Sequence, residues 1–214
     1  MGFSTVMLIN NLAALFSPAI AGLLHIQFGL VSGVRIAYAI VTAAFLGTAI
    51  VRVKLTETLP INRDEKVSIS DVVRSYPKAA KEGLGVWKQL PRSMFFLFLT
   101  NALSSFIFAL SYSFWAVYAT KILRIPELAW ALIMTWLTLI MVLCALPSGK
   151  LADKVGRKKP LLVSWLLLAP FMWLFLNGTQ PKLFIAFLFF GVSNTLFVAG
   201  YSSLEADLVP KELR

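Results

Sequence analysis

The chain has 214 residues, of which 58% are hydrophobic and only 14% are charged, and its mean hydropathy is +0.79. A water-soluble domain of this size does not need so much apolar surface, so the composition excludes that class and indicates a polytopic membrane protein. The net charge of +10 would suit a nucleic-acid partner, but the basic residues lie between apolar segments, which argues against one.

Six apolar windows are long enough to cross a bilayer, which takes about 20 mainly apolar residues per helix. In lipid each backbone amide must be satisfied within its own segment, so runs of this length predict helices and not strands. The windows cover residues 3–24, 32–51, 94–119, 126–147, 160–176 and 182–204. The predicted fold class is therefore all-α, a polytopic membrane bundle of six transmembrane helices.

The positions of the basic residues predict the orientation of the chain. Sixteen of the 20 follow span two, four or six, and the other four lie on the opposite side: Arg35, Lys121, Arg124 and Lys182. Cytoplasmic loops carry an excess of lysine and arginine. We therefore expect a multi-pass protein of the cell membrane, with both termini in the cytoplasm.

The first two windows occupy residues 1–52. Pro18 lies inside the first window and removes a backbone donor, which predicts a bend in the helix. Asn11 shares a helical face with Pro18 and is a candidate for lining a cavity. His25 is the single histidine and falls at the outer end of this window, where one imidazole cannot build a metal site.

Residues 53–93 form a long basic segment between spans two and three. Apolar residues recur there every three or four positions, which is typical of an amphipathic helix lying at the membrane surface. Pro77, Gly83 and Gly85 interrupt this pattern. An interfacial helix and a partly ordered tether therefore fit the segment equally well.

Polar residues follow helical spacing along one face of span three and, more sparsely, of span six. In lipid a polar stripe must face protein or water, so these positions predict a cavity. Close helix packing through small serines would use the same residues equally well. The candidate cavity residues in these two spans are Asn101, Ser105, Tyr112, Trp115, Asn194 and Tyr201.

The most specific motif is the charged segment at residues 149–159, between spans four and five. Gly149 and Gly156 would permit a sharp return from one helix to the next, which a Cβ would resist. Asp153 could cap a helix or pair with Arg157. The spacing Gly-x-Leu-Ala-Asp-x-x-Gly-Arg-Lys-Lys resembles the signature loop of major facilitator superfamily transporters, found after the second helix and, more loosely, after the eighth.

The resemblance extends over essentially all 214 residues and implies a register. In the twelve-helix pattern of that family, a long cytoplasmic loop joins helices six and seven, and the weaker copy of the signature loop joins helices eight and nine. Residues 1–52 then resemble helices five and six, residues 53–93 the central loop, and residues 94–214 helices seven to ten. The chain is expected to be a fragment, and the remaining helices belong to a longer protein or to a separate partner chain.

The resemblance implies a secondary transporter that moves small solutes across the lipid bilayer by alternating access, with a solute that the sequence does not identify. The charged segment would then act as a conformational latch together with the acidic and basic end of span six. The latch candidates are Gly149, Asp153, Gly156, Arg157, Lys158, Glu205, Asp207 and Arg214. The alternative is a stand-alone six-helix membrane protein with a structural or assembly role, or a half-transporter that needs a partner chain.

An enzyme is not expected. The sequence has no His-Glu-x-x-His, Gly-x-Ser-x-Gly or Walker motif, and Cys144 is its single cysteine, so it offers no catalytic cluster, metal site or disulfide framework. We expect no catalytic residue, no cofactor and no metal. No Asp, Glu, Lys or Arg falls near the middle of a span, so a site for proton or ion coupling is not visible in this chain.

Overall fold

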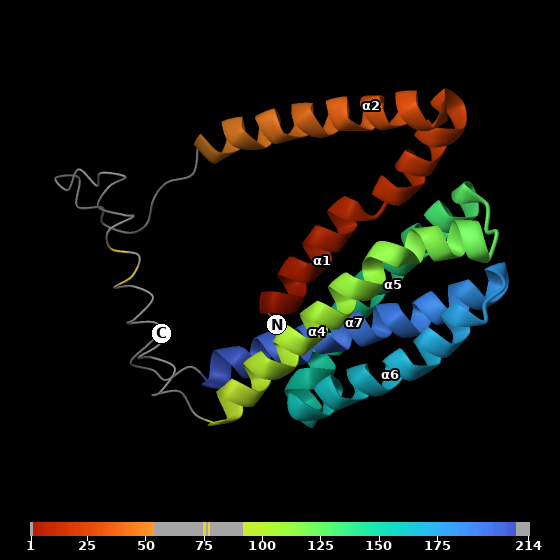
Figure 1. Cartoon of the computed structure of the whole chain (residues 1–214). Helices are drawn as coiled ribbons and strands as arrows, with labels where there is room; N and C mark the ends of the chain where they lie inside the picture. The colour runs from red at the N-terminus through yellow and green to blue at the C-terminus, as the bar shows by residue number, and fades with distance from the viewer. Residues whose placement is uncertain (1, 54–74, 76, 78–91, 209–214) are drawn as a thin grey trace.

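The computed structural model describes residues 2–53, 75, 77 and 92–208, and it is built of helices throughout these ranges apart from short turns. The helices are α1 (Gly2–Ala14), α2 (Ser17–Val53), α4 (Arg92–Val117), the π-helix η1 (Tyr118–Ile122), α5 (Glu127–Val155), α6 (Lys158–Leu176) and α7 (Gln180–Leu208). Figure 1 shows α4 to α7 gathered in one bundle, whereas the second part of α2 stands apart from them. The predicted all-α bundle is confirmed. The helix expected within residues 53–93 and the latch candidate Arg214 lie outside the described residues.

Five of the described helical runs are long and apolar enough to cross a membrane, which supports a multi-pass membrane protein. They are Thr5–Arg52, Arg92–Ile122, Glu127–Val155, Lys158–Leu176 and Gln180–Glu205. The expected number was six, and the difference arises because the first two predicted windows join in one run of 48 residues. That run reverses direction at Gly29, which has φ 71° and ψ 172°. This left-handed φ is accessible to glycine without the steric penalty that a Cβ would add.

A second break separates α1 from α2 directly before Pro18, where the sequence predicts a bend. Pro18 has no N–H to donate to the carbonyl of Ala14, four residues earlier. Ser17 Oγ donates to that carbonyl instead, at 2.8 Å. The carbonyl of Ala14 is therefore not left bare, as an apolar environment requires.

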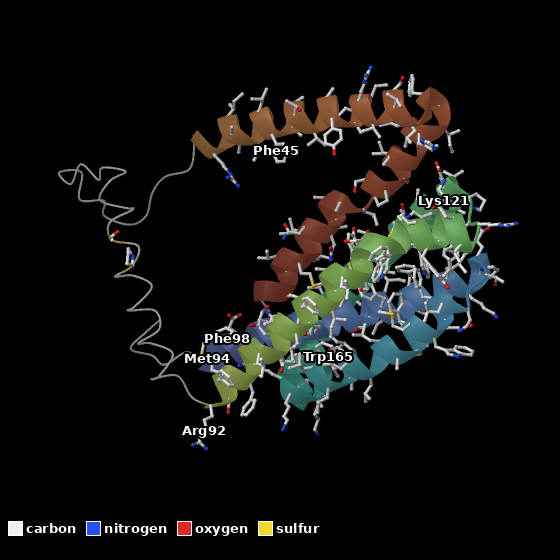
Figure 2. The ribbon with its side chains drawn as sticks, viewed as in Figure 1. Phe45, Arg92, Met94, Phe98, Lys121 and Trp165 are labelled. Carbon is white, nitrogen blue, oxygen red and sulfur yellow. The ribbon has the colours of Figure 1, made fainter. Side chains whose placement is uncertain are left out.

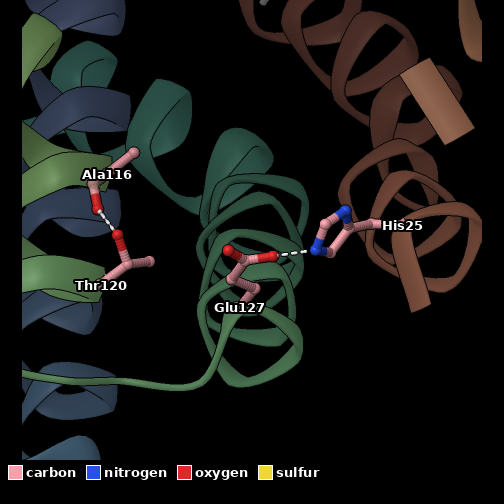
Figure 3. A network of polar contacts seen from close by, with 4 residues as sticks. All are labelled: His25, Ala116, Thr120 and Glu127. Carbon is pink, nitrogen blue, oxygen red and sulfur yellow. Dashed lines mark hydrogen bonds and ion pairs between the residues drawn. The ribbon is translucent and has the colours of Figure 1, made fainter. Parts of the chain in front are cut away.

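The N-terminal helices pack mainly on α5. Gly22 marks a close approach, because a Cβ at this position would lie only 2.7 Å from Ala131 Cβ. One turn further along α2, His25 Nε2 forms an ion pair with the carboxylate of Glu127 at the start of α5 (Figure 3). The tight crossing and the polar contact together fix α2 against α5.

The core lies between α4, α5, α6 and α7 and is built around Trp115, which is 4% exposed. Its ring meets Phe171, Phe187 and Phe190 edge to face, with centroids 5.3, 5.6 and 5.0 Å away. Such aromatic pairs each contribute about 0.5–1.5 kcal/mol beyond the area they bury. Because lipid tails are as apolar as leucine, close packing of this kind is what holds membrane helices together.

The outer surface of the structure suits a hydrocarbon surrounding. Phe45 is 70% exposed and lies on the part of α2 that stands apart from the bundle (Figure 2), where residues 38–52 are all exposed. Arg92 and Lys121 lie at opposite ends of the run formed by α4 and η1. Charges at both ends and apolar residues between them are the pattern expected of a spanning helix.

Helices α5 and α7 come into close contact at Gly191. A Cβ there would lie 2.7 Å from Ile140 Cγ2 and 3.3 Å from Leu137 Cδ1. Glycine at this position therefore sets the distance between the two helices. By contrast, a Cβ at Gly47 on α2 would meet no other atom of the described structure within 4 Å.

We expect Gly191→Ala to destabilise the bundle, because overpacking costs about 1–3 kcal/mol and exceeds the gain of up to about 1 kcal/mol in helix propensity. Gly47→Ala gains the same propensity without a clash and should leave stability unchanged or slightly raised. Unfolding by sodium dodecyl sulfate in mixed micelles, followed by circular dichroism, compares the two variants. Equal midpoints would contradict the assignment of Gly191 as a packing position.

Candidate functional site

A cavity of about 260 Å³ lies between α4, α6 and α7. Helix α4 contributes Asn101, Ser105 and Trp115 to its wall, and α7 contributes Asn194. Positions 101 and 105 are one turn apart, and positions 108, 111 and 115 continue the same face of α4. All fifteen lining residues are uncharged side chains of the described part of the chain.

Four of the seven residues that the sequence singles out as cavity candidates line this cavity. They are Asn101, Ser105, Trp115 and Asn194. The structure thus brings the polar faces of predicted spans three and six to one place. Their part in binding a solute stays a prediction.

The other three candidates lie outside the wall of the cavity. Tyr112 stacks on Phe108 with centroids 5.1 Å apart, and Tyr201 stacks on Phe197 at 5.5 Å. Both phenylalanines line the cavity, so each tyrosine contacts a residue of the wall and is not itself part of the wall. Asn11 lies on α1, and its Nδ2 is buried without a hydrogen-bond partner among the described residues.

The serine and asparagine side chains around the cavity fall into two classes. The hydroxyls of four lining serines donate to backbone carbonyls, and the bond from Ser193 Oγ to the carbonyl of Ser164 joins α7 to α6 at 2.7 Å. Asn101, Ser105 and Asn194 have no side-chain hydrogen bond to any other residue that the structure describes. Two carboxamides and one hydroxyl are therefore free to form hydrogen bonds with a bound solute.

Helix α6 also lines the cavity, with Ser164, Trp165 and Met172 among its residues, and the sequence analysis missed this wall. Ser164 is the only hydroxyl-bearing residue of α6. A lone polar residue in a spanning helix usually faces protein or water, so Ser164 could have indicated that α6 lines the cavity. Trp165 and Met172 could not have indicated this, because an apolar side chain is found equally in contact with lipid, in a protein core and in the wall of a cavity.

The turn between α5 and α6 is shorter than the charged segment that predicted it. Helix α5 continues to Val155 and α6 begins at Lys158, so Gly149 and Asp153 are helical residues of α5. The expected role of Gly149 in the return is therefore wrong: it is buried within the helix, and Gly156, with φ 87°, makes the turn. Arg157, and not Asp153, occupies the N-cap position of α6.

Arg157 ties this turn to the end of α7. Its Nη1 donates to the carbonyl of Ser203 at 3.0 Å and forms an ion pair with the carboxylate of Asp207. Gly200 allows the close approach, because a Cβ there would lie 3.0 Å from the Arg157 carbonyl oxygen. Asp207 is one of the partners that the sequence left open for Arg157.

The other latch candidates lie around this contact. Lys158 is exposed at the first position of α6, and Asp153 is exposed in the last turn of α5. Glu205 is half-buried on α7, two residues before Asp207. The structure thus brings Arg157 and Asp207 together and leaves the role of the whole set as a prediction.

Comparison with known proteins agrees with the sequence motif and the helical bundle. The sequence model of the Major Facilitator Superfamily matches residues 1–214. No curated protein and no solved structure matches the chain. The resemblance noted at residues 149–159 is confirmed, and the chain belongs to the Major Facilitator Superfamily, a family of membrane transporters and not of enzymes.

Proposed function

We propose that this chain contributes helices to a transporter that moves small solutes across a membrane by alternating access. The observation that carries the proposal is the cavity between α4, α6 and α7, in a chain that belongs to a transporter family. A half-open cavity between spanning helices, with a mainly apolar wall that carries several polar side chains, gives a solute a place to bind away from lipid. In alternating access the binding place opens to one side of the membrane and then to the other.

The run Thr5–Arg52 crosses the membrane twice in this proposal. A straight helix of 48 residues would be about 72 Å long, more than twice the hydrocarbon thickness of about 30 Å. The reversal at Gly29 divides it into two lengths of about 35 Å each, which fit the bilayer. The count is then six crossings, the basic side faces the cytoplasm of a cell membrane, and the helices correspond to helices five to ten of the family pattern.

The contact of Arg157 with α7 acts as the latch. Both helices that meet there also line the cavity: Ser164 lies about two turns into α6, and Asn194 lies on α7. Rigid helices transmit a displacement at one end to residues further along. Loosening the ion pair between Arg157 and Asp207 would therefore change the position of two cavity walls.

Alternating access predicts that the cavity can be reached from both faces of the membrane. In a Cys144→Ala background, which removes the single cysteine, we expect Ser105→Cys to react with a membrane-impermeant maleimide in both right-side-out and inverted vesicles. The matched control is Leu166→Cys, whose native side chain is 72% exposed on the lipid-facing surface of α6. It should stay unlabelled, because thiolate formation needs water. Labelling of Ser105→Cys from only one face of the membrane would contradict alternating access.

The latch predicts that charge removal at the turn changes the rate at which the cavity opens. We expect Asp207→Asn to change the labelling rate of Ser105→Cys by up to about fivefold, because a partly exposed ion pair contributes up to about 1 kcal/mol. Arg157→Gln should have a larger effect, since it also removes the charge-assisted hydrogen bond to Ser203.

The control for the latch is Lys159→Gln, which removes the same charge from an exposed position of α6. Equal labelling rates for Arg157→Gln and Lys159→Gln would show that net charge, and not the contact with α7, governs opening. Protein recovered in the membrane fraction should be the same for all three variants.

A further inference from the structure

We infer that the solute bound between α4, α6 and α7 is uncharged and combines one flat apolar ring with neutral hydrogen-bonding groups. The inference rests on the proposed function and narrows its substrate to one chemical class. Three properties of the cavity carry it: the absence of charge in its wall, the polar groups left without partners, and the aromatic rings that surround them.

The first property is the charge of the wall. None of the fifteen lining residues is Asp, Glu, Lys, Arg or His. In the sequence of α4, α5, α6 and α7 the ionisable residues that flank the apolar stretches lie towards the helix ends, such as Arg92 and Lys182. An ion brought into such a site would lose its hydration without gaining a counter-ion, which is strongly unfavourable. A neutral solute meets no such penalty.

The second property is the set of free polar groups. The carboxamides of Asn101 and Asn194 each offer a donor and an acceptor, and Ser105 offers a hydroxyl. None of the three has a side-chain partner within the described part of the chain. Asn101 and Asn194 are half-buried and Ser105 is exposed in the empty cavity. A bound solute would cover them, and a covered polar group without a partner is costly. A solute with its own neutral donors and acceptors is therefore favoured over a plain hydrocarbon such as a lipid tail.

The third property is the aromatic content and size of the site. Trp115 and Trp165 lie on the wall, on α4 and α6, together with Phe108, Phe190 and Phe197. Aromatic side chains favour contact with a flat ring through edge-to-face and offset-stacked arrangements. The volume of about 260 Å³ is below the range of about 300–1,000 Å³ typical of drug-sized ligands. A solute of about one ring fits these limits.

The test uses three probes that each consist of one phenyl ring and one planar head group of similar size. They differ in charge: benzamide is neutral, benzoate is anionic and benzamidinium is cationic. Binding to the full chain in lipid nanodiscs is measured by ligand-observed saturation-transfer NMR, with empty nanodiscs subtracted. We expect benzamide to bind at least about tenfold more tightly than either ion. Equal affinities, tighter binding of an ion, or no binding of any probe would each overturn the inference.

Two substitutions at one position test the wall itself. Asn194→Asp places a carboxylate in the cavity and should raise the affinity for benzamidinium by about tenfold, while lowering that for benzoate. Asn194→Leu keeps the number and branching of the side-chain heavy atoms and removes the amide, so benzamide should bind several-fold more weakly. Unchanged benzamide affinity in the leucine variant would contradict the inference that the solute carries neutral hydrogen-bonding groups.

Asn177→Asp is the matched control, because Asn177 lies at the end of α6 outside the cavity and bonds the Trp173 carbonyl. It should leave all three affinities unchanged. Should Asn194→Asp fail to fold, Asn101→Asp makes the same test from α4.

The two proposals can fail separately. Labelling of Ser105→Cys from both faces without selectivity for benzamide would overturn the substrate class alone. Selective binding of benzamide together with labelling from one face would overturn the proposed function alone.

Discussion

Polar groups cannot be left bare in hydrocarbon, and most of the local structure follows from this constraint. Ser17 covers the carbonyl that Pro18 frees, Ser104 bonds its own helix, and Ser193 bonds the carbonyl of Ser164 on the neighbouring helix. Against this background the unbonded carboxamides at the cavity stand out. Neither carboxamide has a side-chain hydrogen bond within the described residues, so both give the cavity neutral donors and acceptors.

The helices meet where small residues allow their backbones to come close. Gly22 faces Ala131, Gly191 faces Ile140, and Gly200 lies against the carbonyl of Arg157. Because apolar burial gives little advantage in lipid, such close contacts supply much of the association energy. The contact at Gly200 has a second effect, since it holds α7 against the turn where α6 begins and so joins the cavity walls at one end.

The positions of most spans could be predicted from hydropathy, because lipid demands long apolar helices. The window 160–176 differs from α6, Lys158–Leu176, by two residues at one end. Helix α5 was underestimated at its charged end, because hydropathy reports where apolar residues stop and not where backbone bonding stops. Four of the fifteen residues that line the cavity were predicted from residues at helical spacing. Trp165 and the pairing of Arg157 with Asp207 depend on tertiary contacts that no local pattern specifies.

The charge-free interior has an electrical consequence. A membrane potential does work only on charge that moves through it, about 2.3 kcal/mol per elementary charge per 100 mV. The apolar stretches of α4 to α7 contain no Asp, Glu, Lys, Arg or His within the described residues, and the charged side chains lie towards the helix ends. With the uncharged solute proposed above, a rearrangement of these apolar stretches would move almost no charge through the field, so a membrane potential would do almost no work on this step.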